Sequence, residues 1–223
     1  MEKTPATREL VPAVADSALA LSSHHLRHDA LEIHEPEHDA LLYVVAGSGA
    51  LTVADDRAGL EEGSAALVLA DERATLEPGT GELVVLQAIV GPAADRHAPL
   101  GMREVVVDVD AASASQATGA RSFRVLFGPH NGSTRATLFL GYLPPGGAPW
   151  HYHLYDEIVW IPEGPGRVLR RGSEEALQAG TAFRLRPREV HVVENSSRDR
   201  ELTVLGIFTP AGSPAAAYVA PEP

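Results

Sequence analysis

The chain has 223 residues, an apolar content of 44% and a formal net charge of −12, with 30 acidic and 18 basic residues. This length allows one large domain or two domains of about 100 residues each. The lack of a basic stripe argues against a nucleic-acid partner. Because the chain has no cysteine, it forms no disulfide and offers no thiolate metal ligand or cysteine nucleophile.

The first residues lack the apolar stretch of a signal peptide, and no apolar run reaches the length of a transmembrane helix, about 20 residues. The lack of cysteine fits a reducing compartment. We therefore expect a cytoplasmic protein with no membrane partner.

Most of the chain is typical of short β-strands. It has 17 prolines and 20 glycines, which suit many turns, and β-branched runs such as residues 104–109 recur between these turns. Residues 12–22 are consistent with a short helix. Residues 111–120 are small and polar, which is typical of a linker.

The sequence contains a weak internal repeat. Residues 42–49 resemble residues 159–166, and the same offset of 117 residues aligns residues 63–66 with residues 180–183. With one residue of slippage, residues 85–92 align with residues 203–210. This period is too long for a solenoid, so we predict two tandem units: an N-terminal unit over 1–110, a linker over 111–120 and a C-terminal unit over 121–223.

A cluster of metal-binding residue types lies in the second unit. His151 and His153 are two residues apart, so on a β-strand both side chains point to the same face. Glu157 lies four residues further on, and His191 brings a third imidazole from a later segment. Three imidazoles and one carboxylate on one face predict a divalent metal site.

These residues resemble the two sequence motifs of the cupin superfamily. The first motif is a glycine-rich turn followed by His-x-His, Glu and Gly, and it matches residues 144–147, His151, His153, Glu157 and Gly164. The second motif matches Gly180, His191 and Asn195, although Arg186 and Arg188 replace its proline and glycine. The resemblance implies an all-β fold of two tandem antiparallel jelly-roll barrels, a bicupin.

The N-terminal unit carries a degenerate copy of the metal motif. The repeat aligns His34 with His151, but Pro36, Ala40 and Ala74 stand where His153, Glu157 and His191 would be. His38 and Asp39 lie nearby and offer a substitute set in a shifted geometry. We expect the N-terminal unit to be a structural or dimerising copy.

Other residues near the motif are candidates for roles in the site. Strand alternation places Tyr155 on the face of the predicted ligands, as a hydrogen-bond donor, a weak acid or a core residue. Glu157 is also a candidate catalytic base. Arg184 and Arg186 form a basic strand face, which either points inward to bind an anion or outward into solvent.

The resemblance implies a metal-dependent enzyme for a small organic substrate, such as a dioxygenase, decarboxylase, isomerase or lyase. Its metal would be one divalent ion of Fe, Mn, Ni, Co, Cu or Zn, which these ligands all suit. The alternative is a non-catalytic cupin that binds a sugar or phenolic compound and holds a structural metal. In either case we expect a homodimer without nucleic-acid partners.

Overall fold

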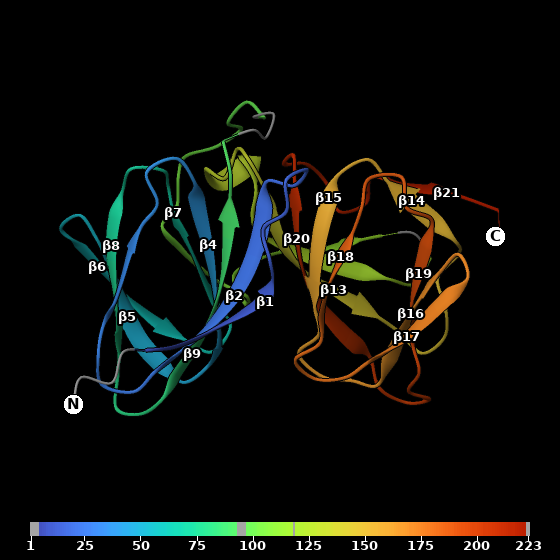
Figure 1. The fold of residues 1–223 in the computed structure, drawn as a ribbon, viewed down its shortest axis with the longest axis horizontal. Coiled ribbons are helices and arrows are strands. Elements are labelled where there is room, and N and C mark those ends of the chain that lie inside the picture. Colours follow the sequence, from blue (N-terminus) through green and yellow to red (C-terminus); the bar gives the residue numbers. More distant parts are fainter. Residues whose placement is uncertain (1–4, 93–96, 118, 222–223) are drawn as a thin grey trace.

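The computed structural model describes residues 5–92, 97–117 and 119–221, and they form two β-rich halves (Figure 1). Among these residues the one helical element is a 3₁₀ turn, η1 (Pro129–Asn131), and no helix is long and apolar enough to cross a membrane. The helix predicted over 12–22 is wrong: the Ser17 amide bonds to the Val14 carbonyl in a turn, and a strand begins at Leu19. At the start of this strand, the side chains of Leu19, Leu21 and Ser23 are buried and those between them are less buried, which is the two-residue period of a strand.

The N-terminal half consists of two antiparallel sheets. The larger sheet has the order β1-β2-β9-β4-β7-β10 and the smaller has the order β3-β8-β5-β6. Their strands are β1 (Ala6–Val11), β2 (Leu19–Leu26), β3 (Leu31–His34), β4 (Asp39–Ala46), β5 (Ser48–Val53), β6 (Asp56–Glu61), β7 (Ser64–Val68), β8 (Arg73–Pro78), β9 (Leu83–Val90) and β10 (Val106–Asp108).

The C-terminal half also consists of two antiparallel sheets, with the orders β11-β12-β13-β20-β15-β18 and β17-β16-β19-β14-β21. Their strands are β11 (Ala114–Gln116), β12 (Ser122–Phe127), β13 (Thr137–Leu143), β14 (His151–His153), β15 (Asp156–Trp160), β16 (Gly166–Arg170), β17 (Ser173–Leu177), β18 (Ala182–Leu185), β19 (His191–Asn195), β20 (Leu202–Thr209) and β21 (Ala217–Val219).

The two halves repeat one strand order. The run β2-β9-β4-β7 corresponds to β13-β20-β15-β18, and the run β3-β8-β5-β6 corresponds to β14-β19-β16-β17. This correspondence follows the internal repeat of the sequence and confirms the predicted fold class of tandem antiparallel jelly-roll barrels. The division at residues 111–120 stays a prediction, and that segment contains β11, which pairs with β12.

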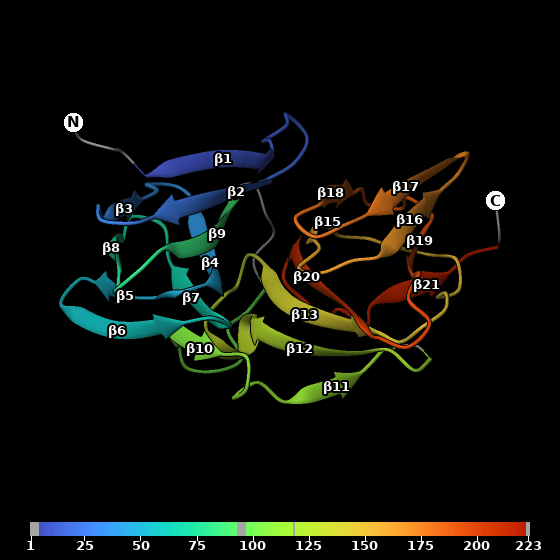
Figure 2. The ribbon, with the colours of Figure 1, turned by 90° about the horizontal axis from the view of Figure 1, so that it is seen from below.

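The two six-stranded sheets pack against each other and bury one core between the barrels (Figure 2). Leu19, Leu67 and Leu86 belong to this core from the first half, and Phe127 and Ile207 from the second. The opposite face of each large sheet covers the inside of its own barrel. Because both faces are buried, strands such as β4 and β20 are almost continuously apolar.

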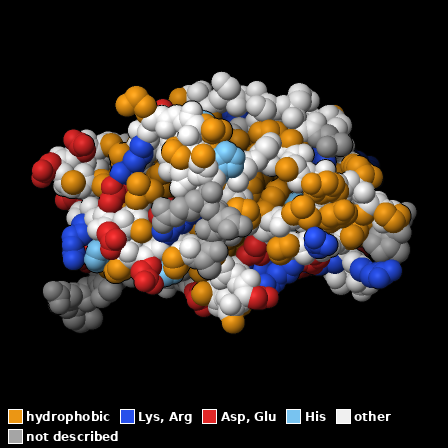
Figure 3. All heavy atoms as spheres, turned by 90° about the horizontal axis from the view of Figure 1, so that it is seen from above, with side chains coloured by type: hydrophobic (Ala, Val, Ile, Leu, Met, Phe, Trp, Pro, Cys, Tyr) orange, Lys and Arg blue, Asp and Glu red, His pale blue; other side chains and the backbone are white. Residues whose placement is uncertain are grey.

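Apolar side chains also gather on part of the surface. On the face shown in Figure 3, hydrophobic side chains collect over the C-terminal barrel. Leu154 before β15, and Tyr218 and Val219 on the edge strand β21, are among the large apolar residues that are exposed to solvent.

Candidate metal centre

The four predicted ligands come from three strands of the C-terminal barrel. His151 and His153 lie on β14, and His191 lies on β19 directly opposite His151 in the antiparallel ladder. Glu157 lies on β15 in the other sheet. The two residues between His153 and β15 carry the chain across the barrel, so the motif spans both sheets from one short segment.

The structure brings these four side chains together. The ring centroid of His191 lies 4.6 Å from that of His151 and 5.0 Å from that of His153. His153 Nε2 lies 2.9 Å from Glu157 Oε2. His153, Glu157 and His191 are buried, and His151 is half-buried. In the described part of the chain, however, no three His, Asp or Glu side chains already form a chelating cluster.

Backbone carbonyls select the tautomer of each imidazole. His151 Nδ1 bonds to the Pro149 carbonyl at 2.9 Å, and His153 Nδ1 and His191 Nδ1 bond to carbonyls at 2.8 Å. Because a carbonyl only accepts, each Nδ1 carries the hydrogen, and each neutral ring keeps its Nε2 lone pair. A histidine oriented in this way is prepared to bind a metal through Nε2.

The contact between His153 and Glu157 fits a cation between them. The buried His153 Nε2 has no hydrogen-bond partner, although it lies 2.9 Å from the Glu157 carboxylate. In the tautomer described above, both atoms are acceptors, so their contact is favourable only with a positive charge between them. A proton or a metal ion supplies that charge, and the donor set therefore fits a divalent metal.

The electrostatic surroundings shift the pKa values of the three histidines in different directions. Burial lowers the pKa of His151, and burial together with the neighbouring imidazoles lowers the pKa of His191 to about 3. Burial also opposes the charged form of His153, but its contact with the Glu157 carboxylate outweighs this and raises its pKa. Two of the three rings are therefore neutral near pH 7, as metal ligands must be.

The four side chains face a small cavity of about 100 Å³ inside the barrel. Its walls are mainly apolar, and they include Tyr155, whose ring stacks on His153 with a centroid distance of 4.1 Å. The Tyr155 hydroxyl donates a long, 3.5 Å hydrogen bond to the Pro214 carbonyl. Burial raises the pKa of Tyr155, which favours a hydrogen-bond donor over a weak acid.

The corresponding region of the N-terminal barrel is filled with hydrocarbon. Ala40 and Ala74, which replace the glutamate and the third histidine, belong to a core cluster with Ile33, Leu51 and Val85. The substitute ligand Asp39 instead lies 3.5 Å from Arg135 of the other barrel and accepts a hydrogen bond from the Ala70 amide. Among the described residues, these contacts favour a structural role for this half.

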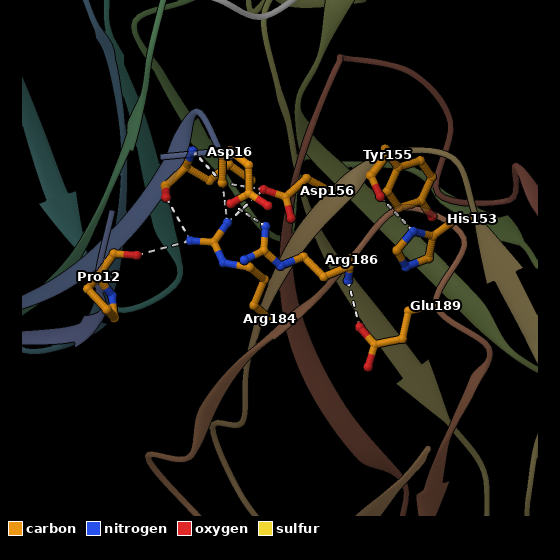
Figure 4. A network of polar contacts seen from close by, with 10 residues as sticks. Pro12, Asp16, His153, Tyr155, Asp156, Arg184, Arg186 and Glu189 are labelled. Carbon is orange, nitrogen blue, oxygen red and sulfur yellow. Dashed lines mark hydrogen bonds and ion pairs between the residues drawn. The ribbon is translucent and has the colours of Figure 1, made fainter. Parts of the chain in front are cut away.

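The predicted basic face of β18 lies at the junction of the two barrels. Arg184 bonds to Asp156 at 2.6 Å, to the Ser17 hydroxyl, and to the carbonyls of Pro12 and Leu19 (Figure 4). Arg184 therefore lies neither in the cavity nor in solvent, so both sequence interpretations are wrong for this residue. Arg186 is more exposed and pairs with Asp16 at 2.8 Å, which again joins the barrels.

Sequence reasoning missed two residues near the site. Asp156 anchors the junction, and it aligns with Asp39 at the repeat offset, so the repeat carried a signal for it. Arg121 lines the cavity from the segment before β12. A lone arginine after a predicted linker has no pattern that marks it, so only the fold reveals its position.

The comparisons with known proteins agree with this architecture. Residues 139–208 match the family model of the cupin domain, and no curated protein sequence matches the chain. A mutant of oxalate decarboxylase from Bacillus subtilis is similar with a TM-score of 0.78 and 15% identity, over 98% of this chain and 76% of that one. AerE from Microcystis aeruginosa is similar with a TM-score of 0.73 and 16% identity, over 94% of this chain and 95% of the other.

A third similar structure is the formate complex of oxalate decarboxylase from Lactobacillus farciminis. Its TM-score is 0.75 at 13% identity, over 98% of this chain and 85% of that one. At these identities the likeness shows the fold alone.

Proposed function

We propose that the chain is a cupin with two barrels in tandem, and that its C-terminal barrel is a metal-dependent enzyme site for a small organic substrate. The proposed ligands of one divalent transition metal are His151, His153, Glu157 and His191. The observation that carries the proposal is the shared orientation of the three imidazoles, each bonded through Nδ1 to a backbone carbonyl. That orientation leaves the Nε2 atom of each ring available to a metal once the ring is neutral, with the buried Glu157 carboxylate in contact with His153.

The residues of the cavity support acid–base chemistry on a bound substrate. A divalent metal, when bound, acts as a Lewis acid that polarises a substrate oxygen. Glu157 is the proposed catalytic base, because its buried carboxylate lines the cavity beside the three histidines. Tyr155 is proposed to donate its hydroxyl hydrogen to the substrate in place of the long bond to the Pro214 carbonyl.

The reaction class is proposed at two levels. A metal-dependent cupin enzyme is the coarser proposal, and a dioxygenase, decarboxylase, isomerase or lyase is the finer one. Two of the similar structures are oxalate decarboxylases, so decarboxylation of a carboxylic acid belongs in the first substrate panel beside dioxygenation. The ligand set suits Fe, Mn, Ni, Co, Cu and Zn, so each metal needs its own panel.

Turnover by metal-loaded protein tests the proposal. We expect His151→Ala to lose metal and activity together, whereas Glu157→Gln keeps part of the metal and loses about 10²–10⁴-fold in turnover, the usual worth of a general base. Glu62→Gln removes an exposed carboxylate and is the matched control. Turnover that is equal in Glu157→Gln and the wild type would remove Glu157 as the base.

A non-catalytic binding protein is the second candidate, favoured by the apolar lining of the cavity. Such a lining suits a phenolic ligand better than a sugar, whose hydroxyls need polar partners. Under this candidate the metal is structural. Metal binding and ligand binding without turnover in any panel would support it over the enzyme.

We further propose that the protein is a cytoplasmic homodimer. The exposed apolar residues Leu154, Tyr218 and Val219 support an association surface on the C-terminal barrel. Light scattering of the purified protein gives the subunit number directly, and a mass of one chain would remove the dimer.

A further inference from the structure

The cavity of the proposed site combines one permanent cation with hydrocarbon walls, and we propose that it selects a small apolar monocarboxylic acid bound by Arg121. This inference rests on the proposed function, because it takes the cavity as the substrate site. It narrows the substrate class to acids with one carboxylate and a short hydrocarbon body.

Arg121 has the position and chemistry of a carboxylate-binding residue. It is half-buried in the segment before β12 and lines the cavity together with His151 and Tyr155. Burial is the main cause of the lowered pKa of His151 and of the raised pKa of Tyr155, and the charge of Arg121 adds to the first shift and opposes the second. The planar guanidinium matches a carboxylate with two parallel hydrogen bonds, which an ammonium group cannot do.

The other residues that line the cavity favour a ligand with a hydrocarbon body. Among the described residues that line the cavity, the Arg, Lys, Asp and Glu side chains are Arg121 and Glu157, and Glu157 is a proposed metal ligand. Most of the other wall residues are apolar, including Phe123, Phe139, Leu143, Val193 and Val204. In metal-free protein, a second carboxylate on the ligand would contact these walls or Glu157, at a high desolvation or repulsion cost. The metal-free cavity therefore suits an apolar monoacid better than a small dianion.

The volume limits the hydrocarbon body. The cavity measures about 100 Å³, whereas a cavity of about 150 Å³ holds benzene in a protein core. A chain of about four carbons is close to the upper size that fits without protruding. A flavonoid-sized body would lie mostly outside.

Calorimetric titration of metal-free and zinc-loaded protein tests the inference with matched probes. Pentanoate and pentanamide share a hydrocarbon body and differ in charge, and metal-free protein separates the effect of Arg121 from that of a metal. We expect pentanoate to bind at least about tenfold more tightly than pentanamide, as for a charge-assisted pair. We expect affinity to rise about threefold to fourfold per methylene from acetate to pentanoate, and in metal-free protein we expect oxalate to bind more weakly than pentanoate.

Three variants test whether Arg121 causes the preference for the acid over the amide. Arg121→Gln is expected to abolish the preference for the acid over the amide, and Arg121→Lys to keep part of it because the charge remains. Arg171→Gln removes an exposed arginine outside the cavity and is expected to leave the preference unchanged. Circular dichroism checks the fold of each variant, and the acetate-to-pentanoate series in the wild type tests the hydrocarbon walls without any substitution.

Each of four results in metal-free protein would overturn the inference: equal binding of acid and amide, no binding of any probe, tighter binding of oxalate than of pentanoate, or an unchanged preference in folded Arg121→Gln. The metal content of the same preparations separates this inference from the proposed function. Metal uptake without acid preference removes only the role of Arg121. Acid preference without metal uptake removes the proposed enzyme and leaves Arg121 as the acid-binding group.

Discussion

At the residue scale, the site depends on close packing behind Glu157. Gly206 on β20 lies beside it, and a Cβ added there would lie 2.2 Å from Phe139 Cε1 and 2.9 Å from Glu157 Oε1. Both neighbours line the cavity. The absence of a side chain at position 206 therefore gives the Phe139 ring and the proposed ligand Glu157 their space.

We predict that Gly206→Ala lowers the free energy of unfolding by about 1–3 kcal/mol, the usual cost of overpacking a core, and weakens metal loading because Glu157 must move. Denaturant unfolding and metal analysis measure the two effects. Gly59→Ala is the control, because a Cβ there meets nothing within 4 Å. Equal stability and metal content in Gly206→Ala and the wild type would contradict this explanation of the packing.

At the element scale, strand β15 joins the barrel junction to the site. Its consecutive residues Asp156 and Glu157 point to opposite faces, as neighbours on a strand do, so Asp156 meets Arg184 at the junction while Glu157 meets His153. The pair Arg184–Asp156 is nearly buried, with 10% of each side chain exposed. Removing one partner would leave the other as a buried, uncompensated charge.

A double-mutant cycle tests this pair. We predict that Arg184→Met and Asp156→Asn each lower the free energy of unfolding by about 3 kcal/mol, and that the double variant costs less than the sum by about 1 kcal/mol or more. Denaturant unfolding of the four proteins gives the coupling. Strictly additive costs would show that the pair contributes no coupling to the junction.

At the scale of the whole molecule, one hydrophobic core crosses the boundary between the barrels. Leu21 and Leu41 from the first half pack in the same cluster as Leu138 and Leu205 from the second. We therefore predict that heat unfolds both barrels in a single transition, with coincident curves by far-ultraviolet circular dichroism and tryptophan fluorescence. Two separate transitions would contradict the shared core.

The 117-residue offset predicted two repeated units, and the spacing of His151 and His153 predicted that they share a face. The jelly-roll barrels and the complete set of four ligands were implied by the resemblance to the cupin motifs. The offset that aligns His34 with His151 also aligns the strand orders of the two halves. The sequence did not predict the position of Arg184. Alternation of side chains along a strand shows which residues share a face, but not whether that face contacts solvent, a cavity or a second sheet. Arg121 was missed for a related reason: its place at the cavity depends on the tertiary fold and follows no sequence period.

The most direct test of the central claim, that the C-terminal barrel holds one metal through His151, His153, Glu157 and His191, is metal analysis of the purified protein beside His191→Ala. Anomalous diffraction would locate any ion. We predict about one divalent transition metal per chain at the four side chains, and its loss in the variant. Failure of the wild type to bind any such metal under saturating loading, or equal binding by His191→Ala, would contradict the claim.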